Sequence, residues 1–300
     1  MKLHILGCTA ATPNTINNPT AQVLETKRHM FLIDCGEGTQ VQLRRQKLRF
    51  ARINHIFISH LHGDHFFGLI GLISTYMLLG RKEDLHIYGP KGIKEVTLLQ
   101  LKLGNAFTSY KLYFHELTSK ESEVIYEDDR MRVRTIPLVH RVYTNGFLFE
   151  EKEEEYILNI PVIEELEIPV VYYNKIKQGG DVIIDDVIFR NADLTLGKKP
   201  QKSYAFCSDT KYTETIVPII NNCTALYHES TFLEKDAALA DKTAHTTAKQ
   251  AATIALKANV TKLILGHFSS RYKNYDVFGE EAKVIFKNTE VAKDGKTFEF

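Results

Sequence analysis

The feature that most constrains this chain is the segment SHLHGDH at residues 59–65, which carries four metal-ligand side chains within six positions. His60, His62, Asp64 and His65 follow an apolar, strand-like segment and precede an apolar run that is long enough for a helix. Burying these side chains unpaired in such a turn would cost several kcal/mol, whereas imidazole and carboxylate groups are preferred ligands of zinc and similar ions. The segment therefore predicts a metal site at the carboxyl end of a strand.

Three more candidate ligands, His140, Asp209 and His267, also stand at the ends of predicted strands. The carboxyl ends of strands are where open α/β sheets build their sites. Seven ligands exceed the four of one tetrahedral ion and suit two zinc ions that share a bridging carboxylate. By position, the first ion would be held by His60, His62 and His140, the second by Asp64, His65 and His267, and Asp209 would bridge the two.

Strand-like and helical segments alternate along most of the chain. Strands are predicted at 3–8, 21–26, 29–35, 53–60, 85–89, 111–117, 123–127, 131–139, 145–149, 203–209, 224–230, 262–268 and at the carboxyl end. Helices are predicted at 65–80, 92–104, 213–221, 246–258 and 276–287. This order fits an α/β sandwich in which two mixed β-sheets carry helices on their outer faces, within a single domain spanning 1–300.

Residues 150–202 do not fit this alternation, because they open on the acidic run 150–155 and end in lysine-bearing segments. We expect an insertion over about 152–180 that projects from the core as an arm. A poorly ordered surface loop is the alternative interpretation. Lys175 and Lys177 are the candidate contacts of this segment with an anionic partner.

The composition limits the kinds of partner that the chain can have. Thirty-eight basic against thirty-seven acidic residues give a formal net charge of +1, so a polyanion must be held by local patches. The four cysteines form no CxxC pair, which predicts a reduced, cytoplasmic protein. No segment reaches the ~18 apolar residues of a membrane span, so no membrane partner is expected.

The signature HxHxDH at 60–65, followed by His140, Asp209 and His267, resembles the metallo-β-lactamase superfamily. Within it the chain is similar to the ribonuclease Z family, and this similarity extends over nearly the whole chain. The segments that carry it include IDCGEGTQ at 33–40, HEST at 228–231, AHTTAKQAA at 244–252 and HFSSRY at 267–272. The resemblance implies an αββα sandwich with an inserted substrate-binding arm.

The resemblance also implies a function. It implies a dizinc endoribonuclease that removes the 3′ trailer from precursor tRNA, leaving a 3′-hydroxyl on the tRNA and a 5′-phosphate on the trailer. Asp64 would be both a metal ligand and the general base for a water whose pKa zinc lowers to about 7. His245 matches a family histidine that is not a metal ligand, and Glu229 matches its carboxylate partner, so that together they would supply a general acid. Arg271 would contact a substrate phosphate. A homodimer is implied as well.

Some features leave alternatives open. The loop 13–19, PNTINNP, has no basic residue where the family usually has some, so weaker contact with the tRNA 3′ end is expected. His245 could also be a surface histidine before a helix. A metallo-hydrolase of small phosphodiesters or esters would suit the near-neutral charge, and a non-catalytic RNA-binding protein is opposed by the complete ligand set.

Overall fold

The computed structural model describes residues 1–12, 15–152, 155–198 and 200–300, and these form two compact units. The first unit comprises Met1–Ile125, Val133–Phe149 and Ser203–Phe300, and the second comprises Tyr126–Arg132 and Glu150–Lys202. Each unit contains an apolar cluster of buried side chains of its own.

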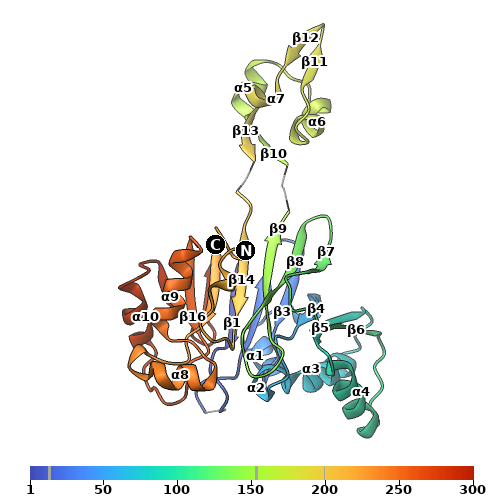
Figure 1. The fold of residues 1–300 in the computed structure, drawn as a ribbon. Coiled ribbons are helices and arrows are strands. Elements are labelled where there is room, and N and C mark those ends of the chain that lie inside the picture. Colours follow the sequence, from blue (N-terminus) through green and yellow to red (C-terminus); the bar gives the residue numbers. More distant parts are fainter. Residues whose placement is uncertain (13–14, 153–154, 199) are drawn as a thin grey trace. The chain divides into compact units, whose positions relative to one another are not determined.

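Two seven-stranded sheets form the centre of the fold, and Figure 1 labels their strands where there is room. In spatial order the first sheet contains β18 (Thr297–Glu299), β1 (Lys2–Gly7), β2 (Ala21–Glu25), β3 (Met30–Ile33), β4 (Ile53–Phe57), β5 (Leu85–Pro90) and β6 (Leu112–Leu117). The second contains β17 (Thr289–Val291), β16 (Lys262–Gly266), β15 (Ala225–Glu229), β14 (Ser203–Cys207), β9 (Asn145–Glu151), β8 (Met131–Pro137) and β7 (Val124–Glu127).

Both sheets are mixed, as the sequence predicts. Strands β3 to β6 run parallel to one another, while β1, β2 and β3 are joined by antiparallel pairing. In the second sheet β14, β15, β16 and β17 are parallel. Because parallel strands end at the same edge of a sheet, the residues that follow β14, β15 and β16 lie next to one another.

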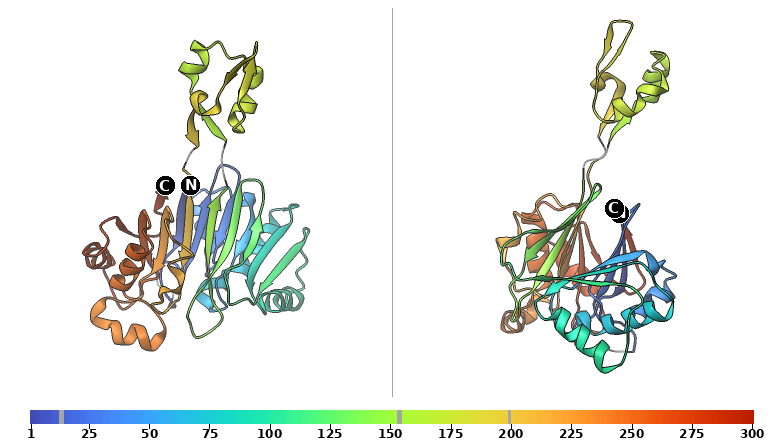
Figure 2. Two further views of the ribbon diagram at one scale, coloured as in Figure 1. Left: turned by 45° about the horizontal axis from the view of Figure 1, so that its top comes forward. Right: turned by 90° about the vertical axis from the view of Figure 1, so that its right-hand side faces the viewer.

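Helices cover the outer faces of the two sheets, which face each other in the first unit (Figure 2). The side of the first sheet carries α1 (Thr39–Arg45), α2 (Gly63–Phe66), α3 (Gly68–Leu78), α4 (Ile93–Leu103) and the 3₁₀ turn η1 (Phe50–Arg52). The chain around the second sheet forms η3 (Glu214–Ile216), η4 (Glu234–Asp236), α8 (Ala237–Thr243), α9 (Ala248–Lys257) and α10 (Asp276–Lys283). No helix among the described residues is both long and apolar enough to span a membrane.

Aromatic side chains fill the space between the sheets. Phe57 of β4 packs against Phe147 and Phe149 of β9, with ring centroids 5.4 and 5.3 Å apart, and Phe31 of β3 lies 5.4 Å from Phe149. All four rings are fully buried. Such pairs add roughly 0.5–1.5 kcal/mol each beyond the burial of their area, so they fix the two sheets against each other beside the strand ends that carry the ligands.

One helix prediction is wrong. Residues 213–221 were expected to be helical, but only the 3₁₀ turn Glu214–Ile216 forms there. Pro218 stands in the middle of the predicted helix, where it lacks an N–H and its ring disfavours a continuous helix.

The second unit holds the predicted insertion 152–180 and has regular structure. Its elements are β10 (Tyr156–Leu158), α5 (Ile160–Glu165), η2 (Val170–Tyr172), α6 (Tyr173–Lys177), β11 (Val182–Ile184), β12 (Val187–Phe189), α7 (Asn191–Leu194) and β13 (Thr195–Lys198). Strand β10 pairs with β13, and β11 pairs with β12. Ile163, Ile168, Ile176, Val182 and Leu194 form the buried cluster, so this unit is held together by its own apolar contacts.

Candidate active site

The structure brings all seven predicted ligands together at the strand ends of the first unit. In one group, His60, His62, His140 and Asp209 place one ligand atom each within 4.8 Å of one another. Asp64, His65 and His267 form a second such group, and Asp209, His245 and His267 form a third that overlaps both.

The carboxylate of Asp209 lies between the first two groups. Its Oδ2 is 3.5 Å from His60 Nε2 and 3.8 Å from His140 Nε2, whereas its Oδ1 is 3.2 Å from His65 Nε2 and 2.9 Å from His267 Nε2. Each oxygen thus faces a different group of histidines. This is the arrangement that a carboxylate shared by two ions requires.

Hydrogen bonds behind the histidines turn their Nε2 atoms toward this centre. His60 Nδ1 is 3.0 Å from Ser59 Oγ, His267 Nδ1 is 2.9 Å from Thr231 Oγ1, and His140 Nδ1–H donates to the carbonyl of Ala244 at 3.0 Å. Outer bonds of this kind fix the tautomer and the orientation of a metal-ligating imidazole.

His140 supplies a direct sign that the centre suits a cation. Its Nδ1 carries the proton that Ala244 accepts, so its Nε2 has only a lone pair. That Nε2 is buried and has no hydrogen-bond partner among the residues that the structure describes. Because a buried polar atom is rarely left unpaired, a lone pair aimed at Asp209 and His60 fits a metal ligand.

The backbone at three of these strand ends is in the left-handed region. Asp34 after β3, Asp209 after β14 and His267 after β16 have φ values of 56°, 57° and 57°. This conformation is uncommon for residues other than glycine, although Asp and His adopt it more often than most. Such conformations cluster at active sites and persist only where the surrounding structure holds them in place.

The electrostatics divide the histidines into two classes. Burial lowers the pKa of His60, His62 and His140 below the ordinary value, so these imidazoles are neutral and can donate lone pairs. Burial also opposes a charge on His267, but Asp209 and Asp64 outweigh it and raise the pKa of His267 to about 10. The carboxylates of Asp209, which is buried, and of Asp64, which is partly buried, thus favour a positive charge at this centre, and metal ions could supply that charge in place of protons.

The carboxylates themselves are ionised. Burial favours the neutral form of Asp64, but His65 and His267 outweigh burial and lower the pKa of this carboxyl group. In the same way His267 and His65 lower the pKa of Asp209. The backbone N–H of Ala11 donates to Asp64 Oδ2 at 2.8 Å, which fixes this oxygen and also favours its charged form.

His245 lies beside the centre and is held by a fully buried glutamate. Its Nδ1–H donates to Glu229 Oε1 at 2.9 Å. Glu229 also accepts hydrogen bonds from the backbone N–H groups of Thr210, Thr231 and Thr246 and from the hydroxyl of Thr231. Since all of these hydrogen-bond partners are donors, Glu229 is held as an anion and keeps a proton on His245 Nδ1.

The chain positions His245 between two helices. Helix α8 ends at Thr243 and is followed by Ala244, whose φ is 58°, and the N–H of His245 donates to Ala240 O at 2.8 Å. Helix α9 then begins with a capping box, in which Thr247 and Gln250 exchange hydrogen bonds. The segment AHTTAKQ therefore joins the end of α8 to the capped start of α9, and only 13% of the His245 side chain is exposed.

A cavity of about 230 Å³ gives access to the centre. Its lining includes His62, Asp64, Asp209, His245, His267, Ala11, Arg141, Thr231, Phe232, Thr243, Ser269 and Ser270. Arg271 is exposed and is not part of this lining, and Lys175 and Lys177 belong to α6 of the second unit.

Comparison with known proteins shows the family. The ribonuclease Z of Bacteroides fragilis is 46% identical over 294 residues, which are 98% of this chain and 97% of that protein. The chain belongs to the ribonuclease Z family. In addition, the model of the family described as anti-Pycsar protein Apyc1 matches residues 1–160, just over half of the chain, so the chain also belongs to the group that this model describes.

Two solved structures confirm the predicted fold of this ribonuclease Z relative. The short form of human tRNase Z is 25% identical and superposes with a TM-score of 0.74, covering 100% of this chain and 99% of that one. The metallo-β-lactamase fold protein YhfI of Bacillus subtilis is 17% identical, with a TM-score of 0.69 over 99% of both chains. The metallo-β-lactamase sandwich expected from the sequence is therefore present.

The structure adds positioning residues that the sequence analysis did not name. Asp34 is fully buried, and its carboxylate accepts hydrogen bonds from Ser59 N at 2.7 Å, from Ser59 Oγ at 2.9 Å and from His65 Nδ1 at 2.7 Å. Thr231 joins Glu229 to His267 through its hydroxyl. Asp34 stands in the quoted segment IDCGEGTQ, so its position after an apolar strand was the available signal.

Asp34→Ala is expected to lower the metal affinity of this ribonuclease Z family member by about 10–100-fold, because His65 loses the bond that orients it. The free energy of unfolding should fall by about 1–3 kcal/mol, since the buried N–H of Ser59 loses its acceptor. Zinc competition with a chelator and thermal unfolding measure the two effects. Asp276→Ala, at an exposed ion pair with Lys293, is the matched control and should change neither. Wild-type affinity in Asp34→Ala would contradict the assigned positioning role.

The loop 13–19 lies only partly within the described residues, because Pro13 and Asn14 fall outside them. Asn18 is bound within the first unit, since its backbone N–H and its side-chain amide both donate to Asp294 Oδ2, at 2.7 and 2.8 Å. Weaker contact between this loop and the tRNA 3′ end stays a prediction.

Proposed function

We propose that this chain is the endoribonuclease that removes the 3′ trailer from precursor tRNA, leaving a 3′-hydroxyl on the tRNA and a 5′-phosphate on the trailer. The observation that carries the proposal is the alignment with ribonuclease Z over 98% of the chain, together with a complete set of seven converging ligand side chains. The test is incubation of the purified protein with a precursor tRNA and analysis of both ends at the cut.

Two zinc ions per chain are part of this proposal. His60, His62 and His140 would hold the first ion, Asp64, His65 and His267 the second, and Asp209 would lie between them. Two observations support this fit. The two oxygens of the Asp209 carboxylate lie near different groups of histidines, and the buried Nε2 of His140 has no hydrogen-bond partner among the described residues. Bound zinc would polarise the scissile phosphate and make a nucleophile available at neutral pH.

The protein side chains would move the protons. Asp64, which is ionised and fixed by Ala11 N–H, would accept a proton from the attacking water. Burial disfavours a charge on His245, but Glu229 outweighs burial and raises the pKa of His245, so that this imidazole can carry a proton to the leaving 3′ oxygen. Arg271, an exposed cation four residues after His267, would contact a substrate phosphate.

A homodimer is also proposed, and an apolar surface of the first unit supports it. Leu78 and Leu79 at the end of α3, Leu99 and Leu103 of α4, and Phe107 after α4 are exposed by 51–81%. Helices α3 and α4 contact each other, and an exposed apolar patch of this kind is typical of a protein interface. Free cysteines and action on tRNA would suit the cytoplasm.

Deleting the second unit should impair the binding of tRNA and spare the hydrolysis reaction itself. We propose that this unit, with Lys175 and Lys177, grips the tRNA body, so replacing residues 155–198 by a short Gly-Ser linker should leave the first unit folded. Hydrolysis of bis(p-nitrophenyl) phosphate should stay largely intact, while kcat/KM for precursor tRNA should fall by about 100-fold or more, because the unit supplies binding energy only.

The double variant Lys175→Ala with Lys177→Ala tests the same proposal without removing the second unit. It should weaken tRNA binding without affecting the small substrate, and each lost phosphate contact should remove about 0.9 from the slope of log affinity against log salt, if the contact resembles that of duplex DNA. Equal loss of both activities in the deletion would show that the second unit is structural.

A hydrolase of small phosphodiesters or esters remains the second candidate. The observation that favours it is the near-zero net charge of +1, to which the second unit contributes Glu164, Glu165, Glu167, Asp185 and Asp186 besides its lysines. A preference for bis(p-nitrophenyl) phosphate over precursor tRNA in kcat/KM would support this candidate.

A further inference from the structure

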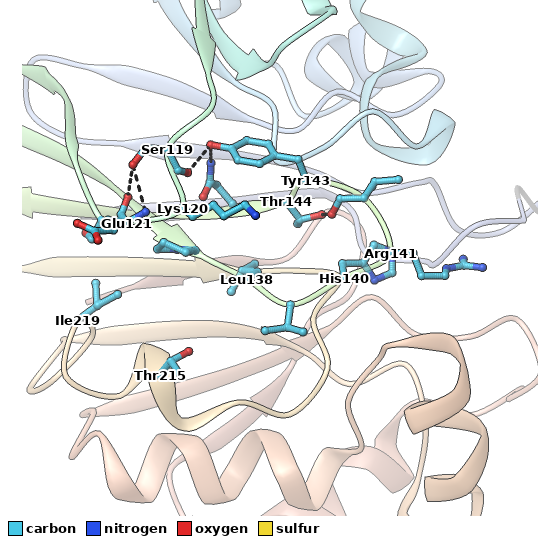
Figure 3. A pocket seen from close by; sticks show the side chains of 15 residues that line it. Ser119, Lys120, Glu121, Leu138, His140, Arg141, Tyr143, Thr144, Thr215 and Ile219 are labelled. Carbon is cyan, nitrogen blue, oxygen red and sulfur yellow. Dashed lines mark hydrogen bonds between the residues drawn. The ribbon is translucent and has the colours of Figure 1, made fainter.

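A second, larger cavity lies next to the active site of the first unit and has no role in the function proposed above. Its volume is about 710 Å³, within the roughly 300–1,000 Å³ of small-molecule sites. It is lined by residues 119–122 and 137–145 and by Thr215 and Ile219. Figure 3 shows Lys120 and Tyr143 on one side of it and Thr215 and Ile219 on the other. Its size suits one nucleotide.

The two cavities are adjacent, because Arg141 lines both of them. The loop that carries Arg141 also supplies His140 to the metal ligands. A nucleic acid strand whose phosphate lies at His140 and Asp209 would therefore pass Arg141 to enter the larger cavity. The guanidinium is suited to contact a phosphate on that path.

The lining has the composition of a nucleotide site. Leu138, Val139, Val142 and Ile219 provide apolar surface for a base, while Lys120 and Arg141 provide positive charge for phosphates. Single-stranded nucleic acids are held by this combination of apolar or aromatic surface with cations. A duplex is far too wide for a space of 710 Å³, so only an unpaired nucleotide fits.

A buried acceptor in the lining indicates what the base would offer. Tyr143 donates its hydroxyl proton to Ser119 O at 2.8 Å, so its oxygen can only accept, and Asn145 Nδ2 donates to it at 2.8 Å. This orients the amide and leaves Asn145 Oδ1 as a free acceptor. Asn145 is 1% exposed, and its Oδ1 has no partner among the residues that the structure describes.

We propose that this cavity binds the first nucleotide of the 3′ trailer and that Asn145 Oδ1 accepts a hydrogen bond from an exocyclic amino group of its base. This inference rests on the proposed function. The trailer side is assigned because the leaving oxygen on the tRNA side belongs next to His245, and neither His245 nor its neighbours Thr231 and Phe232 line the larger cavity. A trailer beginning with cytosine would thus be favoured over one beginning with uracil, which offers an oxygen at the same place.

The test compares two precursor tRNAs that differ only in cytosine or uracil at the first trailer position. Wild-type kcat/KM should be about tenfold higher for cytosine, as expected when a buried acceptor is paired in one substrate and unpaired in the other. Asn145→Leu should abolish this preference. Thr215→Ala is the matched control, because it changes an exposed lining residue on the opposite side of the cavity and leaves Tyr143 and Asn145 in place, and it should retain the preference. Zinc content and thermal unfolding verify that both variants are folded.

A second variant keeps the inference testable if Asn145→Leu does not fold. Lys120 is exposed, so Lys120→Ala should leave the fold intact and weaken binding of a 5′-phosphorylated trailer tetranucleotide, measured by fluorescence anisotropy. Lys82→Ala, at an exposed site outside the cavity, should not. Equal cleavage of the two precursors by the wild type, or a preference that survives Asn145→Leu, would overturn this inference alone. Cleavage of neither precursor would overturn the proposed function.

Discussion

His245→Ala is expected to keep both metal ions and to lose about 10²–10⁴-fold in kcat for precursor tRNA, the usual contribution of a general acid. The reason lies in the contacts of this imidazole. Its Nδ1 is engaged by the fully buried Glu229, and Glu229 is held as an anion by three backbone N–H groups and a hydroxyl. A histidine paired with such a carboxylate is more basic than a free imidazole and holds a proton more readily.

Zinc content decides between the two roles that the geometry allows for His245. Its nearest ligand atom also lies within 4.8 Å of those of Asp209 and His267, so a metal role is geometrically possible. Elemental analysis of His245→Ala should still find two ions per chain. His115→Ala, at an exposed histidine of β6 that belongs to none of the ligand groups, is the control and should match the wild type in both measurements. Loss of zinc from His245→Ala would reassign His245 as a ligand.

The pH profile gives a second test of the same role. Burial lowers the tendency of His245 to ionise, but Glu229 outweighs burial and raises its pKa above the ordinary 6.5. A general acid must be protonated, so the cleavage rate should be full below this raised pKa and fall as the pH rises through it. In His245→Ala that alkaline decline should disappear, because no proton donor remains to be titrated.

The convergence of the seven candidate ligands could be predicted from the sequence, because each of them stands at or just after the end of an apolar strand. Asp209 follows β14 and His267 follows β16, and parallel pairing through β15 brings these two strand ends to one edge. The spacing of SHLHGDH similarly places His60 and Asp64 in one turn after β4. Residue type and strand order were therefore sufficient to assemble the centre.

The positioning residues could not be predicted in this way. Asp34 and Thr231 act through hydrogen bonds to His65 and His267 across the fold, and no local spacing links these pairs in the sequence. The unpaired oxygen of Asn145 is likewise visible only once its amide is oriented by Tyr143. Such roles depend on three-dimensional contacts.

The second unit is built from short elements that leave little pattern in the sequence. The strands of the second unit have three or four residues each, too few for a period-two pattern to stand out. Its core is made of Ile163, Ile168, Ile176, Val182 and Leu194, which are widely spaced along the chain. The fold of this unit is therefore stabilised by contacts between residues far apart in the sequence, and a local hydrophobic pattern does not predict it.

His62→Ala is expected to abolish hydrolysis of both precursor tRNA and bis(p-nitrophenyl) phosphate, with kcat/KM reduced by at least about 100-fold. His62 Nδ1 lies 2.9 Å from His60 Nε2, and both belong to the group that includes His140 and Asp209. Removing this donor would leave the proposed first ion with too few protein ligands for a tight tetrahedral site. Zinc content should fall from about two ions per chain toward one.

The use of two substrates separates this loss from that caused by deleting the second unit. A ligand variant must affect the small diester and the tRNA alike, because both depend on the same centre, whereas the deletion should spare the small diester. His62 is partly exposed in a loop, so its removal should leave the thermal unfolding of the zinc-free protein close to that of the zinc-free wild type. Full activity of His62→Ala, or fewer than two ions in wild-type protein purified without chelator, would rule out a mechanism that depends on two metal ions, whatever the substrate.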